Sequence, residues 1–438
     1  MKISCSLKKG ILSFCILAAA ATAGAQDKAS TFLSPRSDVR GEVRADWNKS
    51  SGLDCIYTFG TATQTPAPKG YEAFYVSHYG RHGSRYAYTA TAYTTLLDML
   101  EEGNASGNLT EYGKEILLRL RDFWADARYR VGELTFTGWE QHRRIAEEMV
   151  SSCPKAFGKG SYVYARSSPS VRSIISMSSF CLSLGRLAAR TEIYEHQGLY
   201  DVQACVPNMG GNPFRYTEPT YVFPYSETPE DFFERRFPGY RDVLAKMFTD
   251  PSAALGDRQP FRAFQDIYML VAGMNSLDMD RRADMKGIFS EEEYAIMWEA
   301  DNYDRFTEYF KYKTPCKSII DDMTAMAQQR INDGQKGADL RFGHDHCMMT
   351  LLMLMDIDGF GTVPENQDDL VYWFQTFRSP MATNLQLRFY RPARKSRNAS
   401  NDEILVKVLL NGEEVHLGNL EPHTWPYYRW TDVKEFLR

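Results

Sequence analysis

Residues 73–77 (AFYVS) and residues 81–85 (RHGSR) form the most informative stretch of this 438-residue sequence. The first segment is rich in aromatic and β-branched side chains, which predicts a β-strand. A loop that contains Gly80 and Gly83 follows directly, and glycine residues are typical of tight turns. In an open α/β sheet, ligand-binding groups gather at the carboxyl ends of the strands. The stretch therefore predicts a strand that ends at a binding loop.

The side chains of this loop are suited to holding a phosphate group. Arg81 and Arg85 flank His82, and paired guanidinium groups bind phosphate through charge-assisted hydrogen bonds. An imidazole held beside phosphorus can attack it as a nucleophile, which divides hydrolysis into two displacements. Gly83 would let the backbone approach the anion closely. An ordinary basic loop is the alternative interpretation of these five residues taken alone.

Strand and helix patterns alternate on both sides of this stretch. Strands are predicted at residues 162–165, 340–342, 385–390 and 404–410. Asn411-Gly412 predicts a hairpin turn into a further strand at 414–417. Helices are predicted at residues 111–128, 139–150, 171–184 and 348–355. This alternation favours the α/β fold class.

The middle of the chain has a different pattern, with proline- and aromatic-rich loops between helical stretches. One helix should begin at Ser290, because Glu293 completes a capping box, and another should cover residues 317–331. We therefore predict an α/β core at residues 26–189 and 331–438, with a mainly helical cap inserted at residues 190–330. Within the core range, residues 26–70 are polar and predict an irregular arm.

The first 25 residues are typical of a signal peptide. Lys2, Lys8 and Lys9 give a basic start, Ile11–Ala21 is apolar, and Ala23-Gly24-Ala25 has the small-x-small form of a cleavage site. The apolar run is shorter than the ~20 residues that span a bilayer. Two cysteines in the segment leave a lipoprotein signal as the alternative. We predict export to the periplasm or the cell exterior.

Cleavage after Ala25 would remove three lysines and no acidic residue, taking the formal charge from −5 to −8. Such an acidic protein is not expected to bind nucleic acid or an anionic membrane through its general surface. Six cysteines would remain: Cys55, Cys153, Cys181, Cys205, Cys316 and Cys347. Some of them can pair in an oxidising compartment, and none has the CxxC spacing of a zinc ribbon or a thioredoxin-like site.

Four segments, in order along the chain, resemble the histidine acid phosphatases, and in particular their phytase and multiple inositol polyphosphate phosphatase branch. Residues 81–85 match the signature R-H-G-x-R-x-P, although Ala87 stands where the proline is expected. Residues 132–142 resemble G-E-L-T-x-x-G-x-x-Q-H, and residues 166–172 (RSSPSVR) resemble the arginine segment of the branch. Residues 342–345 (FGHD) resemble the family's His-Asp pair.

The resemblance implies a histidine-phosphatase-type α/β sandwich, a small-molecule phosphomonoester as substrate, and neither a metal nor an organic cofactor. It implies that His82 is the nucleophile and Asp345 the proton donor. It assigns substrate binding to Arg81, Arg85, Arg166 and His344. Arg172 is then expected on the helix surface or behind the site, and residues 132–142 beside it as support.

Phytate or another inositol polyphosphate is the substrate that the resemblance favours, and a general acid or sugar-phosphate phosphatase is the alternative. Nearby arginines would depress the pKa of Asp345, so we expect activity to favour acidic pH unless burial and the substrate dianion offset them. His346 is expected in core packing, as a hydrogen-bond donor behind the site, or in substrate choice. Three further alternatives are a metal-dependent hydrolase that uses His344 and His346, a non-catalytic phosphate-binding protein and a phosphomutase.

Overall fold

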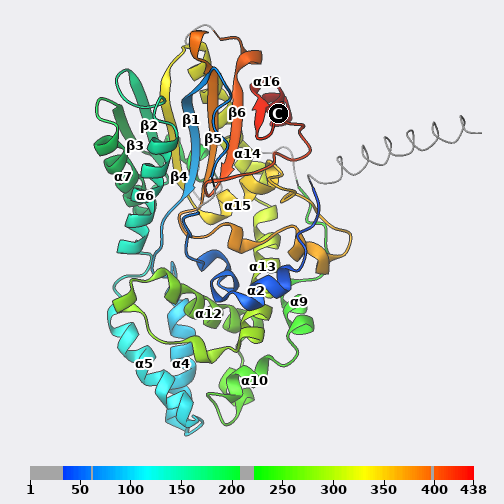
Figure 1. The fold of residues 1–438 in the computed structure, drawn as a ribbon. Coiled ribbons are helices and arrows are strands. Elements are labelled where there is room, and N and C mark those ends of the chain that lie inside the picture. Colours follow the sequence, from blue (N-terminus) through cyan, green and yellow to red (C-terminus); the bar gives the residue numbers. More distant parts are fainter. Residues whose placement is uncertain (1–32, 61–62, 208–220, 396–398) are drawn as a thin grey trace, which may run out of the picture.

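The structure is a computed structural model. One mixed β-sheet organises the upper part of the molecule in Figure 1. The structure describes residues 33–60, 63–207, 221–395 and 399–438, so the predicted signal peptide lies outside them. The strands are β1 (Tyr71–Arg81), β2 (Ser161–Ser167), β3 (Glu192–Gln197), β4 (Lys336–Gly343), β5 (Asn384–Pro392), β6 (Leu405–Leu410), β7 (Glu413–Glu414) and β8 (Tyr427–Arg429). Their order is β3-β2-β4-β1-β5-β6-β7, and β8 pairs with β6.

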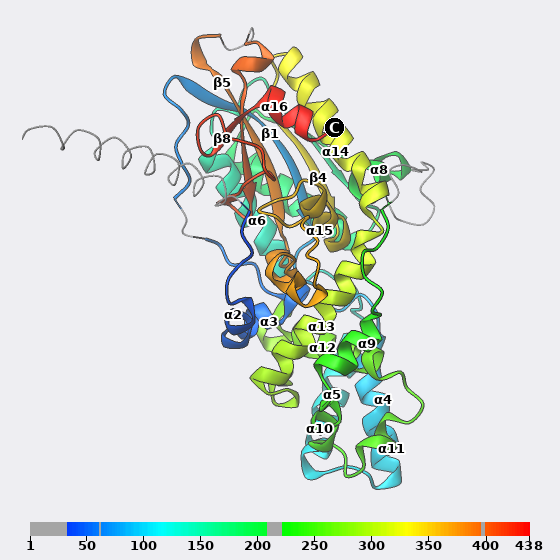
Figure 2. The ribbon, with the colours of Figure 1, turned by 90° about the vertical axis from the view of Figure 1, so that its right-hand side faces the viewer.

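Helices cover both faces of the sheet. Strands β3, β2, β4 and β1 are parallel, and β5 joins β1 in the antiparallel direction. Helices α6 (Phe136–Ser152) and α7 (Val171–Leu187) pack on one face, and α14 (Lys313–Asn332) and α15 (Asp345–Leu354) pack on the other (Figures 1 and 2). Because side chains alternate along a strand, Val76 of β1 faces the first layer, whereas Tyr75 and Tyr79 face the second.

The predicted α/β fold class is confirmed, and local patterns located most of its elements. The four predicted helices correspond to α5 (Glu111–Ala127), α6, α7 and α15. Ser290 caps α13 (Glu291–Phe310) in the predicted capping box with Glu293. Asn411 and Gly412 both have positive φ, 53° and 85°, which is the backbone of a two-residue hairpin turn between β6 and β7.

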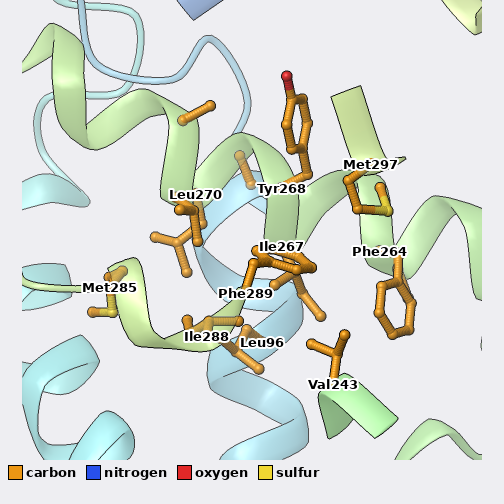
Figure 3. Close-up of a cluster of buried hydrophobic side chains, with 14 of the residues drawn as sticks. Leu96, Val243, Phe264, Ile267, Tyr268, Leu270, Met285, Ile288, Phe289 and Met297 are labelled. Atoms are coloured by element: carbon orange, nitrogen blue, oxygen red, sulfur yellow. The ribbon is translucent and has the colours of Figure 1, made fainter. Parts of the chain in front are cut away.

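A helical lobe lies below the sheet in Figure 1 and is built from residues 91–127 and 229–310. Its helices are α4 (Thr91–Ser106), α5, α9 (Pro229–Arg236), α10 (Tyr240–Ala245), α11 (Pro251–Leu255), α12 (Pro260–Gly273) and α13. Figure 3 shows part of its apolar core, to which Leu96 of α4, Ile267 of α12 and Met297 of α13 all contribute. Tyr268 of α12 donates a 2.7 Å hydrogen bond to the Ser50 carbonyl, which ties the lobe to the N-terminal segment.

The arrangement differs from the predicted core and cap ranges in three places. Strand β3 lies within residues 190–330 but pairs with β2 as the edge of the sheet. Helix α14 lies almost wholly within the same range but packs on one face of the sheet. Helices α4 and α5 lie within residues 26–189 but belong to the lobe, because α4 packs on α12 and α5 packs on α4. The separate cap domain therefore stays a prediction whose ends do not coincide with those of the lobe.

The predicted irregular arm contains two short helices, α2 (Val39–Ala45) and α3 (Trp47–Ser50). Long-range contacts stabilise them: Trp47 stacks on Tyr294 of α13 with ring centroids 4.1 Å apart, and Arg40 forms a 2.8 Å ion pair with Glu299. A 3₁₀ turn, η1 (Gly52–Asp54), then leads the chain toward the site described below. The polar composition of the arm carries no signal for these partners, which lie about 250 residues further along the chain.

Short elements complete the described chain: α8 (Val202–Cys205), α16 (Trp430–Phe436) and 3₁₀ turns at Leu199–Asp201, Met274–Ser276, Met279–Arg281, Lys286–Ile288, Gln367–Tyr372, Thr376–Arg378, Ala393–Lys395 and Asn401–Glu403. The six cysteines that follow the predicted signal peptide lie buried as thiols in the structure, with no disulfide between them. None of the described helices combines the length and the apolar character that crossing a membrane requires.

Candidate active site

The carboxyl ends of β1 and β4 bring two predicted segments together. These strands are parallel neighbours, and Arg81 is paired with Gly343 in their register, so His82 and His344 follow at the same sheet edge. A pocket of about 280 Å³ opens there between the sheet and the helical lobe. Of the residues predicted to bind or react with substrate, those that line it are Arg81, His82, Arg85, His344 and Asp345.

His82 is buried and has a defined proton position. Its Nδ1 lies 3.0 Å from the Gly83 carbonyl oxygen, and a carbonyl can only accept a hydrogen bond. Nδ1 therefore carries the proton and donates it, which leaves the lone pair on Nε2. Burial, followed by the charges of Arg85 and Arg81, holds the pKa of His82 well below its usual value. The ring is consequently neutral and nucleophilic at Nε2.

The loop that carries His82 rests on the first turn of α6. A Cβ atom on Gly83 would lie 2.4 Å from the Gly138 carbonyl oxygen, so the two glycines allow a close backbone approach. Gln141 accepts a 2.9 Å hydrogen bond from the Ser84 backbone and donates a 3.0 Å bond to the Ser84 hydroxyl. Thr135, which caps α6, also donates to the Ser84 carbonyl. Residues 132–142 thus support the loop from behind.

Alanine at position 87 makes a contact that proline could not make. Its backbone N–H donates a 2.7 Å hydrogen bond to the hydroxyl of Tyr93, and its carbonyl accepts from Gly132 at 2.8 Å. Because proline has no backbone N–H, the family's proline would remove the first bond. Hydrogen bonds to α4 and to the turn before α6 therefore fix this end of the loop in place of a proline ring.

Arg81 and Arg85 present nitrogen atoms to the pocket. Nη1 of Arg81 donates to the carbonyls of Leu53 and Ser379 at 2.6 and 2.7 Å, which anchors the guanidinium. Within the described chain, its buried Nε and Nη2 have no hydrogen-bond partner, nor does Nε of Arg85. Buried guanidinium groups with free donors are suited to an anion that accepts several hydrogen bonds.

His344 and Asp345 begin α15 and meet partners from three other elements. Arg172 Nη2 lies 3.4 Å from His344 Nδ1, and since arginine can only donate, Nε2–H of His344 donates to Ser168 at 2.9 Å. Tyr309 of α13 donates a 2.8 Å hydrogen bond to the Asp345 carboxylate. Burial alone would raise the pKa of Asp345, but positive charge, that of Arg81 above all, holds it well below its usual range.

A scan of protein-family models and a search of curated proteins found no match for this chain. Solved structures do match. The multiple inositol polyphosphate phosphatase of Bifidobacterium longum, in complex with inositol hexasulfate, aligns with a TM-score of 0.70 at 17% identity, over 89% of this chain and 97% of that one. The phytase from D. castellii aligns with a TM-score of 0.66 at 14% identity, over 89% and 84% of the two chains. This chain has the histidine acid phosphatase fold.

The histidine acid phosphatase fold was the expectation drawn from the four sequence segments, and it is confirmed. The phytase from Citrobacter braakii also aligns, with a TM-score of 0.51 at 11% identity, over 84% of this chain and 97% of that one. At these low sequence identities, the structural alignments establish the fold alone. The chemistry below is therefore argued from the residues of this chain.

Within the histidine acid phosphatase fold, Arg166, which the resemblance assigns to substrate binding, is not among the residues that line this pocket. Its guanidinium is held by Asp322 of α14, with hydrogen bonds of 2.6 and 3.1 Å, and it does not line the pocket. Arg172, six residues later in the first turn of α7, does line it. The reason is geometric: Arg166 is a strand residue directed toward the α14 layer, whereas α7 begins at the pocket edge. In the sequence, the only indication of this arrangement was that the RSSPSVR segment contains a second arginine, Arg172.

Sequence reasoning also missed the residues that the lobe and η1 bring to the pocket. Tyr309 belongs to α13, 36 residues before its partner Asp345, and no local pattern links the two. Asp54 of η1 and Glu308 of α13 line the pocket as well. His346 stacks on His344, with ring centroids 5.4 Å apart and planes 9° from parallel, so it lies beside the site rather than in the core. Among the described residues, no group of three or more histidines, cysteines and acids is arranged to hold a metal ion.

Proposed function

We propose that this protein is a phosphomonoester hydrolase that works through a phosphorylated His82. One observation carries the proposal: a neutral histidine with its lone pair on Nε2 lies among Arg81, Arg85 and Arg172, with Asp345 across the same pocket. Guanidinium groups stabilise the charge that spreads over the phosphate oxygens during transfer. The histidine supplies the nucleophile that such a transfer needs.

In the first proposed step, His82 Nε2 attacks phosphorus while the ester P–O bond breaks. Asp345 gives its proton to the departing alkoxide, and Arg81, Arg85 and Arg172 hold the three remaining phosphate oxygens. In the second step, water attacks the phosphohistidine and Asp345 takes up its proton. The N–P bond then breaks, which releases phosphate and restores neutral His82.

The proton on Asp345 gives the proposal a pH dependence. Because positive charge holds the pKa of Asp345 well below its usual range, the carboxyl is ionised in the free protein at neutral pH. The protonated fraction grows as the pH falls, and a bound phosphate dianion would raise the pKa further. His82 stays neutral in the acidic range because its own pKa is also lowered. The reaction should therefore be faster at acidic pH.

We further propose inositol phosphates, from phytate to the lower esters, as the substrate class, since solved structures with the same fold are phytases and inositol polyphosphate phosphatases by name. Other phosphomonoesters, sugar phosphates among them, are the alternative. We also propose export from the cell, supported by the signal-peptide pattern of residues 1–25. Fractionation of expressing cells would test it, and protein retained in the cytoplasm would contradict it.

His82→Ala should remove activity without removing the fold. We expect phosphate release at acidic pH to survive a chelator in the wild type and to fall at least ~10³-fold in the variant, because the nucleophile is lost. The measurement is phosphate released from phytate, inositol monophosphate and a sugar phosphate. His423→Ala, at an exposed histidine outside the pocket, is the matched control. Release abolished by the chelator would favour a metal-dependent hydrolase instead.

A further inference from the structure

Tyr309 joins the helical lobe to the residue that donates the proton in the proposed reaction. It lies in the last turn of α13, which runs from the lobe to α15 (Figures 1 and 2). Asp345 is the first residue of α15, and its Oδ2 accepts a 2.8 Å hydrogen bond from the Tyr309 hydroxyl. Both side chains line the pocket that contains His82. A contact between two parts of the fold therefore acts on one carboxyl group.

The Tyr309 hydroxyl has one direction for its proton. Its side chain is buried, and its ring lies beside those of Tyr312 and His346, with ring centroids 6.3 Å away in both cases. Burial, followed by the charge of Asp345, holds the pKa of Tyr309 well above its usual value, so the phenol keeps its proton. Within the described chain, Asp345 is the one hydrogen-bond partner of this hydroxyl. Because a buried O–H without an acceptor costs free energy, it stays directed at Oδ2.

This bond decides which carboxyl oxygen of Asp345 carries a proton. A protonated carboxyl has one O–H donor, and its other oxygen is the better acceptor. A proton on Oδ2 would take away the acceptor of the Tyr309 hydroxyl, whereas a proton on Oδ1 leaves that bond intact. The recorded neighbour of Oδ1 is Nδ1 of His346 at 3.9 Å, which is too far for a hydrogen bond. Oδ1 is therefore the oxygen that can exchange a proton with a bound molecule.

We infer that Tyr309 is a positioning residue of the proposed reaction, because by holding Oδ2 it confines the exchangeable proton of Asp345 to Oδ1. The inference rests on the proposed phosphatase activity and deepens it. In the first step the Oδ1–H bond breaks as the alkoxide gains its proton. In the second step an O–H bond of water breaks and the Oδ1–H bond forms again. Oδ2 keeps its bond to Tyr309 in both steps, so the carboxyl group does not need to rotate between them.

The same bond affects the proton affinity of Asp345. A hydrogen bond donated to an ionised carboxyl lowers its pKa, so removal of the Tyr309 hydroxyl should raise the pKa of Asp345. Besides Tyr309, the ionisable groups that face Asp345 are Arg81, His82, Arg85, Tyr88, Arg172, His344 and His346. A substitution at Tyr309 leaves all of them in place. A changed pH dependence therefore reports the lost hydroxyl.

The first test measures kcat/KM against pH for inositol monophosphate in the wild type, Tyr309→Phe and Tyr303→Phe. The limb that falls as the pH rises follows the loss of the proton from Asp345. In Tyr309→Phe this limb should move to higher pH by about one unit, because one hydrogen bond to a charged group is lost. Tyr303→Phe is the matched control in the same helix. It loses a 2.9 Å bond to the Glu227 carbonyl and lies outside the pocket lining, so its limb should not move.

The second test changes the leaving group. Each protein is assayed at its own pH optimum with inositol monophosphate and with para-nitrophenyl phosphate, whose leaving group departs as a stable anion and needs no proton. Tyr309→Phe should lower kcat/KM for inositol monophosphate about tenfold, since the proton donor is less well oriented, and change the other value by less than about twofold. Thermal unfolding of all three proteins checks that the fold is retained.

Two results would overturn the inference and leave the phosphatase proposal intact. One is a limb that stays in place or moves to lower pH in Tyr309→Phe. The other is an equal loss of kcat/KM with both substrates, which is what a merely structural role predicts. By contrast, release from neither substrate, or release that persists in His82→Ala, would refute the phosphatase proposal itself.

Discussion

Arg172 and Arg166 have the same side chain but opposite surroundings. The guanidinium of Arg172 lies beside His344 at the pocket, and burial together with neighbouring positive charge lowers its pKa to about 10. Arg166 forms a buried ion pair with Asp322, which Arg341 of β4 shares at 2.7 Å. One arginine is therefore placed to bind an anion, and the other holds α14 to the sheet.

Replacing each of the two arginines by alanine should have a different effect, on catalysis for Arg172 and on stability for Arg166. Arg172→Ala should lower kcat/KM by about 10² at an unchanged Tm, because one donor to the transition-state phosphate is lost. Arg172→Lys should recover only part of the loss, since lysine lacks the planar fork. Arg166→Ala should instead lower the free energy of unfolding by roughly 3 kcal/mol, because a buried carboxylate loses one partner. Steady-state kinetics measures kcat/KM, and thermal unfolding measures stability. If Arg166→Ala lowered kcat/KM without lowering stability, the structural role of Arg166 would be contradicted.

At the scale of elements, the site depends on where α6 begins. Its first turn approaches the His82 loop so closely that a Cβ atom on Gly138 would lie 2.3 Å from the Ser84 carbonyl oxygen. Thr135 and Gln141, in the cap and second turn of the same helix, bond to Ser84. The position of the nucleophile is thus set by a helix that contributes no side chain to the pocket.

Gly138→Ala should lower activity by displacing this loop. The added methyl group must push the Ser84 backbone away, and a displacement of about 1 Å at a reacting group costs about 10² in rate. Gly273→Ala is the matched control, because nothing lies within 4 Å of its Cβ position, and the change should leave kcat/KM as it is. Wild-type kinetics in Gly138→Ala would contradict the supporting role of α6. The measurement is kcat/KM, with circular dichroism to confirm the fold.

For the whole molecule, acidity acts on chemistry and on stability in opposite directions. A lower pH protonates Asp345 and should favour the proposed reaction. However, burial lowers the pKa of both His78 and His142 to about 3, and these rings lie between the sheet and α6 and α7. His78 also faces the positive charge of Arg341. Both histidines therefore fold in the neutral form.

Stability should consequently fall as the medium becomes acidic. Below about pH 6.5 the two histidines are protonated in the unfolded chain but stay neutral in the folded chain. Each should therefore lower the free energy of unfolding by about 2 kcal/mol between pH 7 and pH 5. His142→Leu should reduce this fall by about 2 kcal/mol. His423→Leu, at an exposed position, should leave it unchanged. Denaturant unfolding at the two pH values measures the difference, and equal falls in all three proteins would contradict burial as the cause.

The sequence by itself determined the elements and the loop that carries the nucleophile. Periodicity located α5, α6, α7 and α15 because an amphipathic helix repeats within one or two turns. The aromatic and β-branched side chains of residues 73–77 located β1. The loop at residues 81–85 was expected at the carboxyl end of a strand, since binding groups gather there in an open α/β sheet. These are local properties, or they follow directly from strand direction.

Tertiary structure alone decided which side chains reach the pocket. It turned Arg166 toward Asp322, moved Arg172 to the site, and brought Tyr309, Asp54 and Glu308 to it from the lobe and η1. It also assigned β3 to the sheet and α4 and α5 to the lobe. The physical reason is that these contacts join residues far apart in the chain. Each depends on the direction of a side chain and the packing of whole elements, and short-range patterns encode neither.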